Sequence, residues 1–347
     1  MSPPLTFALI GCGAIGRFRA EGLMRTPGAK LAAVSDIDAA RGQAFASEFG
    51  ARYVPDWEQA IAGADAVIVS THPPLHEPMC VAALGAGKHV LCEKPLARNV
   101  EGCRRILDAA RNSGRHLATG FNYRHYAAIQ TARQILDSGR IGELDHIRSY
   151  AGHPGGSQFT APWVYDVNTM GGGALVDNGI HILDLTLYFL GEVSEVKGYR
   201  TSGVWEKGAC EDNAFALIKN PKGPVATLQA SWTEWRGYRF WIEVYGTRGC
   251  VRAMYPPMMA ECRWFEKLED RPRREFFLYP LFQVIERVKS YKYTLGNSIV
   301  AELTEFVRVA RGESQPRTSA TGLDGLRATA VAQAAYRSSE SGETVRL

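Results

Sequence analysis

The stretch FALIGCGAIG, residues 7–16, decides how the first part of this 347-residue chain folds. A short apolar run followed at once by glycines predicts a buried strand, and helical periodicity follows over residues 14–25. Between the two, the glycines fit the pattern GxGxxG. Gly11 permits a tight turn, Gly13 lets the backbone approach a pyrophosphate, and Gly16 lets the helix pack close to the sheet. The first N–H groups of this helix can then bind phosphate.

Strands and helices alternate through the rest of the first third of the chain. Strand-like apolar runs separated by helical segments occur at 31–36, 52–54, 66–70, 89–94 and 116–121. This alternation predicts βαβ units and a parallel sheet. We therefore expect an α/β domain, a doubly wound Rossmann fold, over residues 1–122.

An acidic residue, Asp36, ends the second predicted strand, twenty residues after Gly16. A carboxylate at this place can accept hydrogen bonds from both hydroxyls of an adenosine ribose, and it repels a 2′-phosphate. The next residues, Ile37 and Asp38, supply no arginine that could hold such a phosphate. We therefore expect NAD rather than NADP. The alternative is that Asp36 only caps the following helix, which Asp38 could also do.

Composition and charge narrow the class of protein. The hydrophobic fraction of 46%, the charged fraction of 22% and the net charge of +4 fit a soluble globular protein and not a nucleic-acid binder. Seven scattered cysteines without a CxxC pair indicate reduced thiols. No basic segment precedes the first apolar run, and no run has the length of a membrane span. We expect a cytoplasmic protein without nucleic-acid or membrane partners.

The pattern changes after about residue 143. Strand-like runs occur at 145–152 and repeatedly between 194 and 254, where no helices intervene. Such runs predict a mostly antiparallel sheet. We expect a second, α+β domain over 123–347, with a large open sheet that carries helices on one face.

One apolar, helix-like segment of this second domain carries polar residues at helical spacing. It reads GGGALVDNGIHILD, residues 171–184, and its Asp177, His181 and Asp184 follow each other at spacings of four and three. On a helix over 174–190 they lie on nearly one stripe, which could face a bound substrate. Two other interpretations stay open. Asp177 and His181 could satisfy each other's hydrogen bonds inside a core, or the residues could form a metal site. The metal site lacks an evident ligand from another segment.

The motifs resemble, in order, those of the glucose–fructose oxidoreductase / inositol dehydrogenase / MocA family. They are GCGAIG (11–16), THPPLH (71–76), AGKHVLCEKPLA (86–97), GFN (120–122), the 171–184 segment and the closing segment 321–347. The resemblance implies an NAD-dependent oxidoreductase that transfers a hydride between nicotinamide and a secondary alcohol or ketone of a sugar, cyclitol or sugar derivative. It also implies a homodimer or homotetramer formed through the C-terminal sheet.

The resemblance places catalysis at Lys94, Asp177 and His181. The charge of Lys94 would stabilise a forming alkoxide. His181 suits the role of base because its unperturbed pKa lies near neutrality, and Asp177 can orient that ring or bind a hydroxyl. In some family members the lysine is assigned the proton transfer, so the choice between Lys94 and His181 as base stays open.

The resemblance and the glycine motif together define two sets of expected contacts and no metal ligands. The cofactor set is Gly11, Gly13, Ala14, Ile15, Gly16, Asp36, Ile37, Thr71, Pro73, His76, Glu93, Lys94 and Asn122. The substrate set is Lys94, Tyr123, His153, Trp163, Asp177, Asn178 and His181. Tyr123 stands where the family often has arginine, and residues 256–295 have no assigned role.

Two rival functions use the same fold. A glycosidase or lyase could oxidise its substrate, eliminate and re-reduce, with no net production of NADH. A non-catalytic NAD(H) sensor would need neither Lys94 nor the acid and histidine of 171–184.

Overall fold

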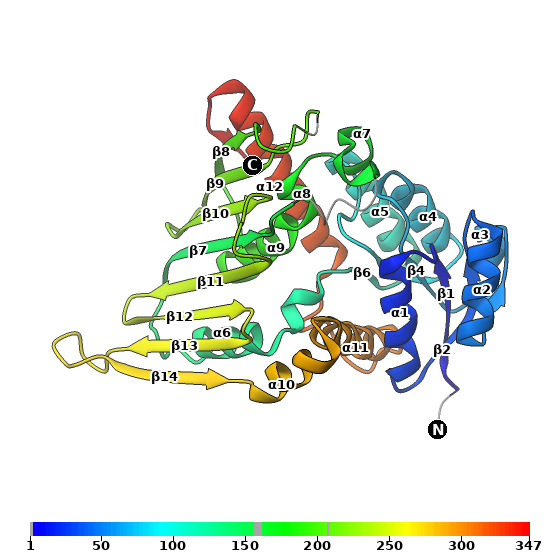
Figure 1. Cartoon of the computed structure of the whole chain (residues 1–347), viewed down its shortest axis with the longest axis horizontal. Coiled ribbons are helices and arrows are strands. Elements are labelled where there is room, and N and C mark those ends of the chain that lie inside the picture. The colour runs from blue at the N-terminus through cyan, green and yellow to red at the C-terminus, as the bar shows by residue number, and fades with distance from the viewer. Residues whose placement is uncertain (1–2, 156–161, 207) are drawn as a thin grey trace. The chain divides into compact units, whose positions relative to one another are not determined.

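The structure, a computed structural model, describes residues 3–155, 162–206 and 208–347, which form two compact units (Figure 1). The first unit comprises Met1–His125 and Tyr291–Leu326, and the second comprises Tyr126–Ser290 and Arg327–Leu347. The units are thus discontinuous in sequence, unlike the consecutive domains 1–122 and 123–347 expected above. The segment Tyr291–Leu326 belongs to the first unit because of apolar packing, which is described below.

A six-stranded parallel sheet, in the order β3-β2-β1-β4-β5-β6, forms the centre of the described part of the first unit. The strands are β1 (Leu5–Ile10), β2 (Ala29–Ser35), β3 (Arg52–Tyr53), β4 (Ala66–Val69), β5 (His89–Cys92) and β6 (Leu117–Thr119). The helices are α1 (Ala14–Arg25), α2 (Ala39–Phe49), α3 (Trp57–Ala62), α4 (Pro73–Gly85), α5 (Val100–Ser113), the 3-10 helix η1 (Asn122–His125) and α11 (Lys292–Ala310). The expected doubly wound fold is confirmed.

Each face of this sheet has its own apolar core, because side chains alternate along a strand. Phe7 and Leu9 of β1 pack with helices α1 and α11, and the rings of Phe7 and Phe306 lie 5.9 Å apart. Ile10 packs on the other face among residues of α4 and α5. Helix α11 thus fills one face of the sheet, which explains why residues 291–326 belong to the first unit.

A buried arginine joins three elements of the first unit. Arg19 of α1 is 1% exposed, and its Nε donates to Glu93 Oε1 at 2.6 Å. Its Nη1 donates to Glu302 of α11. Glu93 follows β5, so this network links α1, the carboxyl end of β5 and α11. Burying these charges is tolerable only because they are paired and hydrogen-bonded.

The described part of the second unit contains a nine-stranded sheet in the order β14-β13-β12-β11-β7-β10-β9-β8-β15 (Figure 1). Its strands are β7 (Leu144–Gly152), β8 (Glu195–Thr201), β9 (Asn213–Lys219), β10 (Val225–Ser231), β11 (Arg239–Gly246), β12 (Gly249–Tyr255), β13 (Met259–Trp264), β14 (Arg273–Leu278) and β15 (Val345–Arg346). The pair β7–β10 is parallel and the other pairs are antiparallel. The expected large, mostly antiparallel sheet is therefore confirmed.

The second unit also contains helices, some of which pack against this sheet. They are α6 (Ala127–Asp137), η3 (Pro162–Tyr165), α7 (Val167–Met170), α8 (Ala174–Asp177), α9 (Gly179–Leu190), α10 (Pro280–Lys289) and most of α12 (Gly322–Ser341). Helix α9 packs against β7, β10 and β11, and α6 packs against β12 and β13. Along β9 the residues Ala214, Ala216 and Ile218 are buried, whereas Phe215 and Leu217 are exposed. The sheet therefore keeps an uncovered face.

The helix expected over 174–190 is interrupted. Helix α8 ends at Asp177, and α9 begins after Asn178. A Cβ atom at Gly179 would lie 2.4 Å from Ala230 Cβ and 2.7 Å from the carbonyl oxygen of Ala174. Glycine at this position lets the chain pass close to β10, where a side chain would not fit. Asp177 and His181 are thus on consecutive short and long helices, and not on one helix.

None of the described helices is both long and apolar enough to span a bilayer.

Replacing Arg19 with methionine should lower the free energy of unfolding by about 3–5 kcal/mol, because Glu93 and Glu302 would remain buried without their cation. Urea denaturation measures the change. The control is Arg17→Met on the same helix, where the arginine and its partner Glu48 have side chains 47% and 48% exposed. That variant should unfold at nearly the wild-type urea concentration, since exposed pairs are screened. Similar losses in both variants would contradict the importance of the buried network.

Candidate active site

The turn between β1 and α1 has the geometry that the glycine motif predicts. Gly11 has φ +97°, and a Cβ atom there would lie 2.6 Å from the carbonyl oxygen of Ser70. A Cβ atom at Gly16 would lie 2.1 Å from the carbonyl oxygen of Gly11. Gly13 is exposed, and apart from Gly13 and its two chain neighbours no described residue has an atom within 4 Å of its Cβ position. The backbone at Gly13, followed by the first N–H groups of α1, is therefore open to a phosphate ligand.

Asp36 lies directly beside this turn. Its carboxylate accepts hydrogen bonds from the backbone N–H groups of Cys12 at 2.7 Å and Asp38 at 2.9 Å. Arg41 of α2 adds two more, from Nε at 3.2 Å and Nη2 at 2.7 Å. Burial raises the pKa of Asp36, but the hydrogen bonds from Arg41, Asp38 and Cys12 outweigh burial and leave that pKa below its usual range.

The capping role considered for Asp36 belongs to its neighbour. The side chain of Asp38 accepts a hydrogen bond from the backbone N–H of Arg41 and so caps α2. Asp36 itself follows β2, at the carboxyl edge of the sheet, and the fully exposed Ile37 stands next to it. Arg41 was not identified from the sequence, because only the two residues after Asp36 were considered as possible phosphate ligands.

The loop after β4 is held from inside the unit by His76. This side chain is fully buried, and its two ring nitrogens lie 2.7 Å from the carbonyl oxygen of Pro95 and 3.0 Å from that of Thr71. Burial lowers the pKa of His76 despite these two carbonyl partners. His76 therefore joins the loop to the segment that carries Lys94. Thr71 is half-buried, and Pro73, the first residue of α4, is buried.

Lys94 is half-buried and lies just beyond the carboxyl end of β5. The preceding Glu93 is fixed by Arg19, and its Oε2 accepts from the backbone N–H of Lys94 at 3.4 Å. Asn122 in η1 donates from Nδ2 to Ser298 Oγ at 2.7 Å, which attaches η1 to α11. Tyr123, beside it, is 8% exposed. The carboxyl edge of the parallel sheet thus brings the glycine turn, Asp36 and Lys94 to one side of the unit.

In the second unit, Asp177 has two partners that fix its orientation. Its Oδ2 accepts from Trp232 Nε1 at 3.1 Å and lies 3.3 Å from His153 Nε2. His153 Nδ1 accepts the backbone N–H of Gly155 at 3.1 Å, so the ring proton is on Nε2 and is directed at Asp177. His153 therefore orients Asp177. Trp232, fully buried at the end of β10, was not among the candidate site residues.

The remaining candidates of the second unit lie on η3, α9 and the residue before α9. His181 is 7% exposed in the first turn of α9, and Asp184 is 1% exposed one turn later. Asn178 and Trp163 are half-buried. The candidates thus fall into two sets, with Lys94 and Tyr123 in the first unit and His153, Trp163, Asp177, Asn178 and His181 in the second.

A buried carboxylate, Glu211, holds the glycine turn that precedes Asp177. It accepts the backbone N–H groups of Gly173 at 2.7 Å and Leu175 at 2.9 Å, and the hydroxyl of Tyr336 at 2.8 Å. Burial raises the pKa of Glu211 above its usual range even with these donors. A Cβ atom at Gly173 would lie 2.2 Å from the carbonyl oxygen of Glu211. Nothing in the sequence around Glu211 indicates this contact, because it joins residues far apart in the chain.

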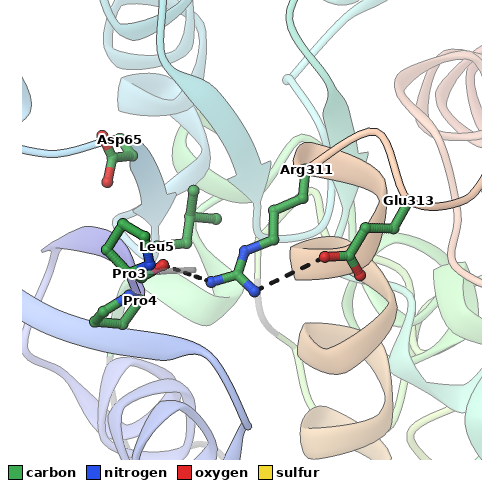
Figure 2. A pocket seen from close by; sticks show the side chains of 6 residues that line it. All are labelled: Pro3, Pro4, Leu5, Asp65, Arg311 and Glu313. Atoms are coloured by element: carbon green, nitrogen blue, oxygen red, sulfur yellow. Dashed lines mark hydrogen bonds and ion pairs between the residues drawn. The ribbon is translucent and has the colours of Figure 1, made fainter. Parts of the chain in front are cut away.

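A shallow pocket of about 350 Å³ lies elsewhere in the first unit (Figure 2). Its lining residues are Pro3, Pro4, Leu5, Asp65, Arg311 and Glu313. Leu5 begins β1 and Asp65 precedes β4, so the pocket is at the amino edge of the parallel sheet. Ligands of doubly wound sheets bind at the carboxyl edge. Arg311 donates to the carbonyl oxygen of Pro3 at 2.8 Å, which fits a structural contact (Figure 2).

Comparison with known proteins agrees with this geometry. A model for the oxidoreductase family with an NAD-binding Rossmann fold matches residues 5–121, and a GFO/IDH/MocA C-terminal domain model matches residues 129–252. Inositol 2-dehydrogenase 2 of Saccharopolyspora erythraea is 31% identical over 98% of this chain and 94% of its own length. Inositol 2-dehydrogenase of Rhizobium meliloti is 29% identical, with 96% of each chain covered.

Solved structures extend the likeness to the whole fold. Levoglucosan dehydrogenase in complex with NADH has a TM-score of 0.87 at 22% identity, over 99% of each chain. An oxidoreductase domain protein from Kribbella flavida has a TM-score of 0.86 at 25% identity, also over 99% of each chain.

The fold, the glycine turn and the family matches together identify the chain as an NAD-binding oxidoreductase. The chain belongs to the GFO/IDH/MocA family. Its residues fit the dinucleotide: the position of Gly13 is open, the first N–H groups of α1 follow it, and the Asp36 carboxylate stands beside the turn.

Replacing Glu211 with glutamine should lower the free energy of unfolding by about 1–3 kcal/mol, because an amide NH₂ would face a backbone N–H that loses its acceptor. The same change should lower kcat with a substrate, since the turn leading to Asp177 and His181 loosens. NADH affinity should not change. Tyr336→Phe is the matched control, because it removes one donor and keeps both backbone contacts. Unchanged stability and kcat in Glu211→Gln would contradict the positioning role.

Proposed function

We propose that this enzyme oxidises a secondary alcohol of a sugar, cyclitol or sugar derivative, or reduces the corresponding ketone. The relatives named inositol 2-dehydrogenase and the neighbour named levoglucosan dehydrogenase support this class of substrate. The observation that carries the proposal is the fixed orientation of Asp177 by Trp232 and His153. An oriented, partly exposed carboxylate at a helix end, hydrogen-bonded by Trp232, suits the recognition of a hydroxyl group.

The proposed chemistry divides among three side chains. NAD, when bound, accepts or supplies the hydride. Lys94 stabilises negative charge on the substrate oxygen as the C–H bond breaks. His181 or Lys94 takes the hydroxyl proton, and Asp177 holds the reacting hydroxyl or its neighbour. We assign Tyr123, Trp163 and Asn178 to further substrate contacts.

The proposed cofactor contacts follow the carboxyl edge of the parallel sheet. Backbone groups from Gly11 to Gly16, with Ala14 and Ile15 at the start of α1, would bind the pyrophosphate. Asp36 would accept the hydroxyls of the adenosine ribose, and Ile37 would contact the adenine side. Thr71, Pro73 and Asn122 would line the nicotinamide end. We assign His76 and Glu93 to holding these segments, because both are buried and engaged by protein groups.

The first experiment follows NADH absorbance with purified enzyme, NAD and separate inositols, anhydrosugars, aldoses and glycosides. Steady NADH formation with one class is expected and would name the substrate family. The Lys94→Met variant should lose activity by about 10²–10³-fold, whereas Lys30→Met, at an exposed position of β2, should keep it.

Two results would overturn the proposal. Substrate consumption without NADH accumulation would show a glycosidase or lyase that uses NAD transiently. Full activity of Lys94→Met would remove the lysine from the chemistry. A ketone panel with NADH covers the reverse direction, and inactivity in both directions would leave a sensor of NAD(H).

We propose further that the enzyme is a cytoplasmic homodimer or homotetramer formed through the uncovered face of the C-terminal sheet. None of the seven cysteines, each within the described residues, forms a disulfide bond, which suits a reducing compartment. On the uncovered face, Tyr199 is 59%, Leu217 49% and Phe215 38% exposed. A second copy of the chain would remove these apolar side chains from water.

Replacing Leu217 with lysine should dissociate the oligomer, because it buries a charge at the proposed interface. Light scattering after size-exclusion chromatography measures the mass. The control is Met24→Lys on α1 of the first unit, where the methionine is 64% exposed. A wild-type protein with the mass of one 38.1 kDa chain would refute the proposal. So would a Leu217→Lys variant that keeps the oligomeric mass.

A further inference from the structure

The carboxylate of Asp36 is saturated before any cofactor binds. An ionised carboxylate offers about four lone-pair positions. Among the described residues, four N–H groups donate to Asp36: one each from Cys12 and Asp38, and two from Arg41. The ribose hydroxyls of NAD would need acceptor positions on this same carboxylate. The Arg41 guanidinium therefore occupies acceptor positions that the ribose hydroxyls would need if Asp36 binds the ribose.

Arg41 can leave this position more easily than the backbone donors. Its side chain is 47% exposed, whereas that of Asp36 is 6% exposed. Cys12 and Asp38 donate from the main chain, which is fixed by the glycine turn and by the start of α2. Arg41 is in the first turn of α2, and its Nη1 lies 3.6 Å from Asp38 Oδ2. The guanidinium thus lies, partly exposed, between the two acids Asp36 and Asp38.

We propose that Arg41 competes with the adenosine ribose for Asp36 and is the group that would bind a 2′-phosphate. The pair Asp36–Arg41, rather than Asp36 alone, then sets the preference for NAD over NADP. This inference rests on the ribose role proposed above for Asp36. A guanidinium binds a phosphate through bidentate hydrogen bonds, which a lysine side chain does not form.

The charges predict opposite effects for the two members of the pair. Without Arg41, Asp36 and Asp38 stand unopposed and repel a 2′-phosphate more strongly, while NAD no longer competes with a guanidinium. Without the carboxylate of Asp36, Arg41 loses its strongest partner and faces the ligand. The wild-type enzyme therefore binds NADP weakly but measurably, because the repelling carboxylate is partly neutralised.

The test measures dissociation constants for NADH and NADPH by calorimetric titration of Arg41→Ala, Asp36→Ser and the double variant. Arg41→Ala should raise the ratio of the NADPH constant to the NADH constant about tenfold, the loss of one charged hydrogen bond. Asp36→Ser should lower this ratio. In the double variant the ratio should rise again, because the guanidinium that would bind the 2′-phosphate is missing. Arg105→Ala is the control, since Arg105 forms a similar exposed fork with Glu77 and should leave the ratio unchanged.

The outcomes separate this inference from the function on which it rests. If Asp36→Ser lowers the ratio but Arg41→Ala does not raise it, and the double variant equals Asp36→Ser, the inference fails and the ribose role of Asp36 stands. If Asp36→Ser leaves the ratio unchanged, both the inference about Arg41 and the ribose role of Asp36 fail. Thermal unfolding of each variant, without nucleotide, establishes that the binding changes occur in folded protein.

Discussion

One buried cation organises the first unit. Arg19 lies out of contact with water, and this is tolerable only because Glu93 and Glu302 both accept its N–H groups. The pairing joins the helix that follows the glycine turn, the segment that carries Lys94 and the late helix α11. The position of Lys94 relative to the glycine turn therefore depends on a charge network and not on apolar packing alone. Apolar contacts would allow small shifts, whereas hydrogen-bonded charges require defined geometry.

In the second unit, too, a buried charged side chain holds a turn, here the glycine turn before α8. Glu211 accepts two backbone N–H groups of the glycine turn and the hydroxyl of Tyr336. Because helices begin with N–H groups that lack partners, a carboxylate placed there fixes where α8 starts. Asp177 then meets Trp232 and His153. In both units a buried acid holds backbone or charge close to residues assigned to the chemistry.

Much of the fold and part of the site follow from local patterns. The GxGxxG turn, the βαβ alternation, the antiparallel runs and the Asp38 cap depend on residues near each other in the chain, and the structure confirms them. The continuous helix over 174–190 was wrong: it is interrupted at Asn178, next to Gly179, which packs closely against Ala230 of β10. The partners of Asp177 and the place of α11 depend likewise on contacts between distant segments.

The sequence by itself determined the class of protein. Glycine spacing, strand periodicity and motif order carry that information locally, since a turn or a strand needs only its own residues. Only the tertiary structure decided what each polar side chain does. It turned His76 inward between two carbonyl oxygens, directed His153 at Asp177 and placed Arg41 on Asp36. The physical reason is that a hydrogen bond has a range of about 3 Å, so a partner's identity is set by the folded chain and not by sequence separation.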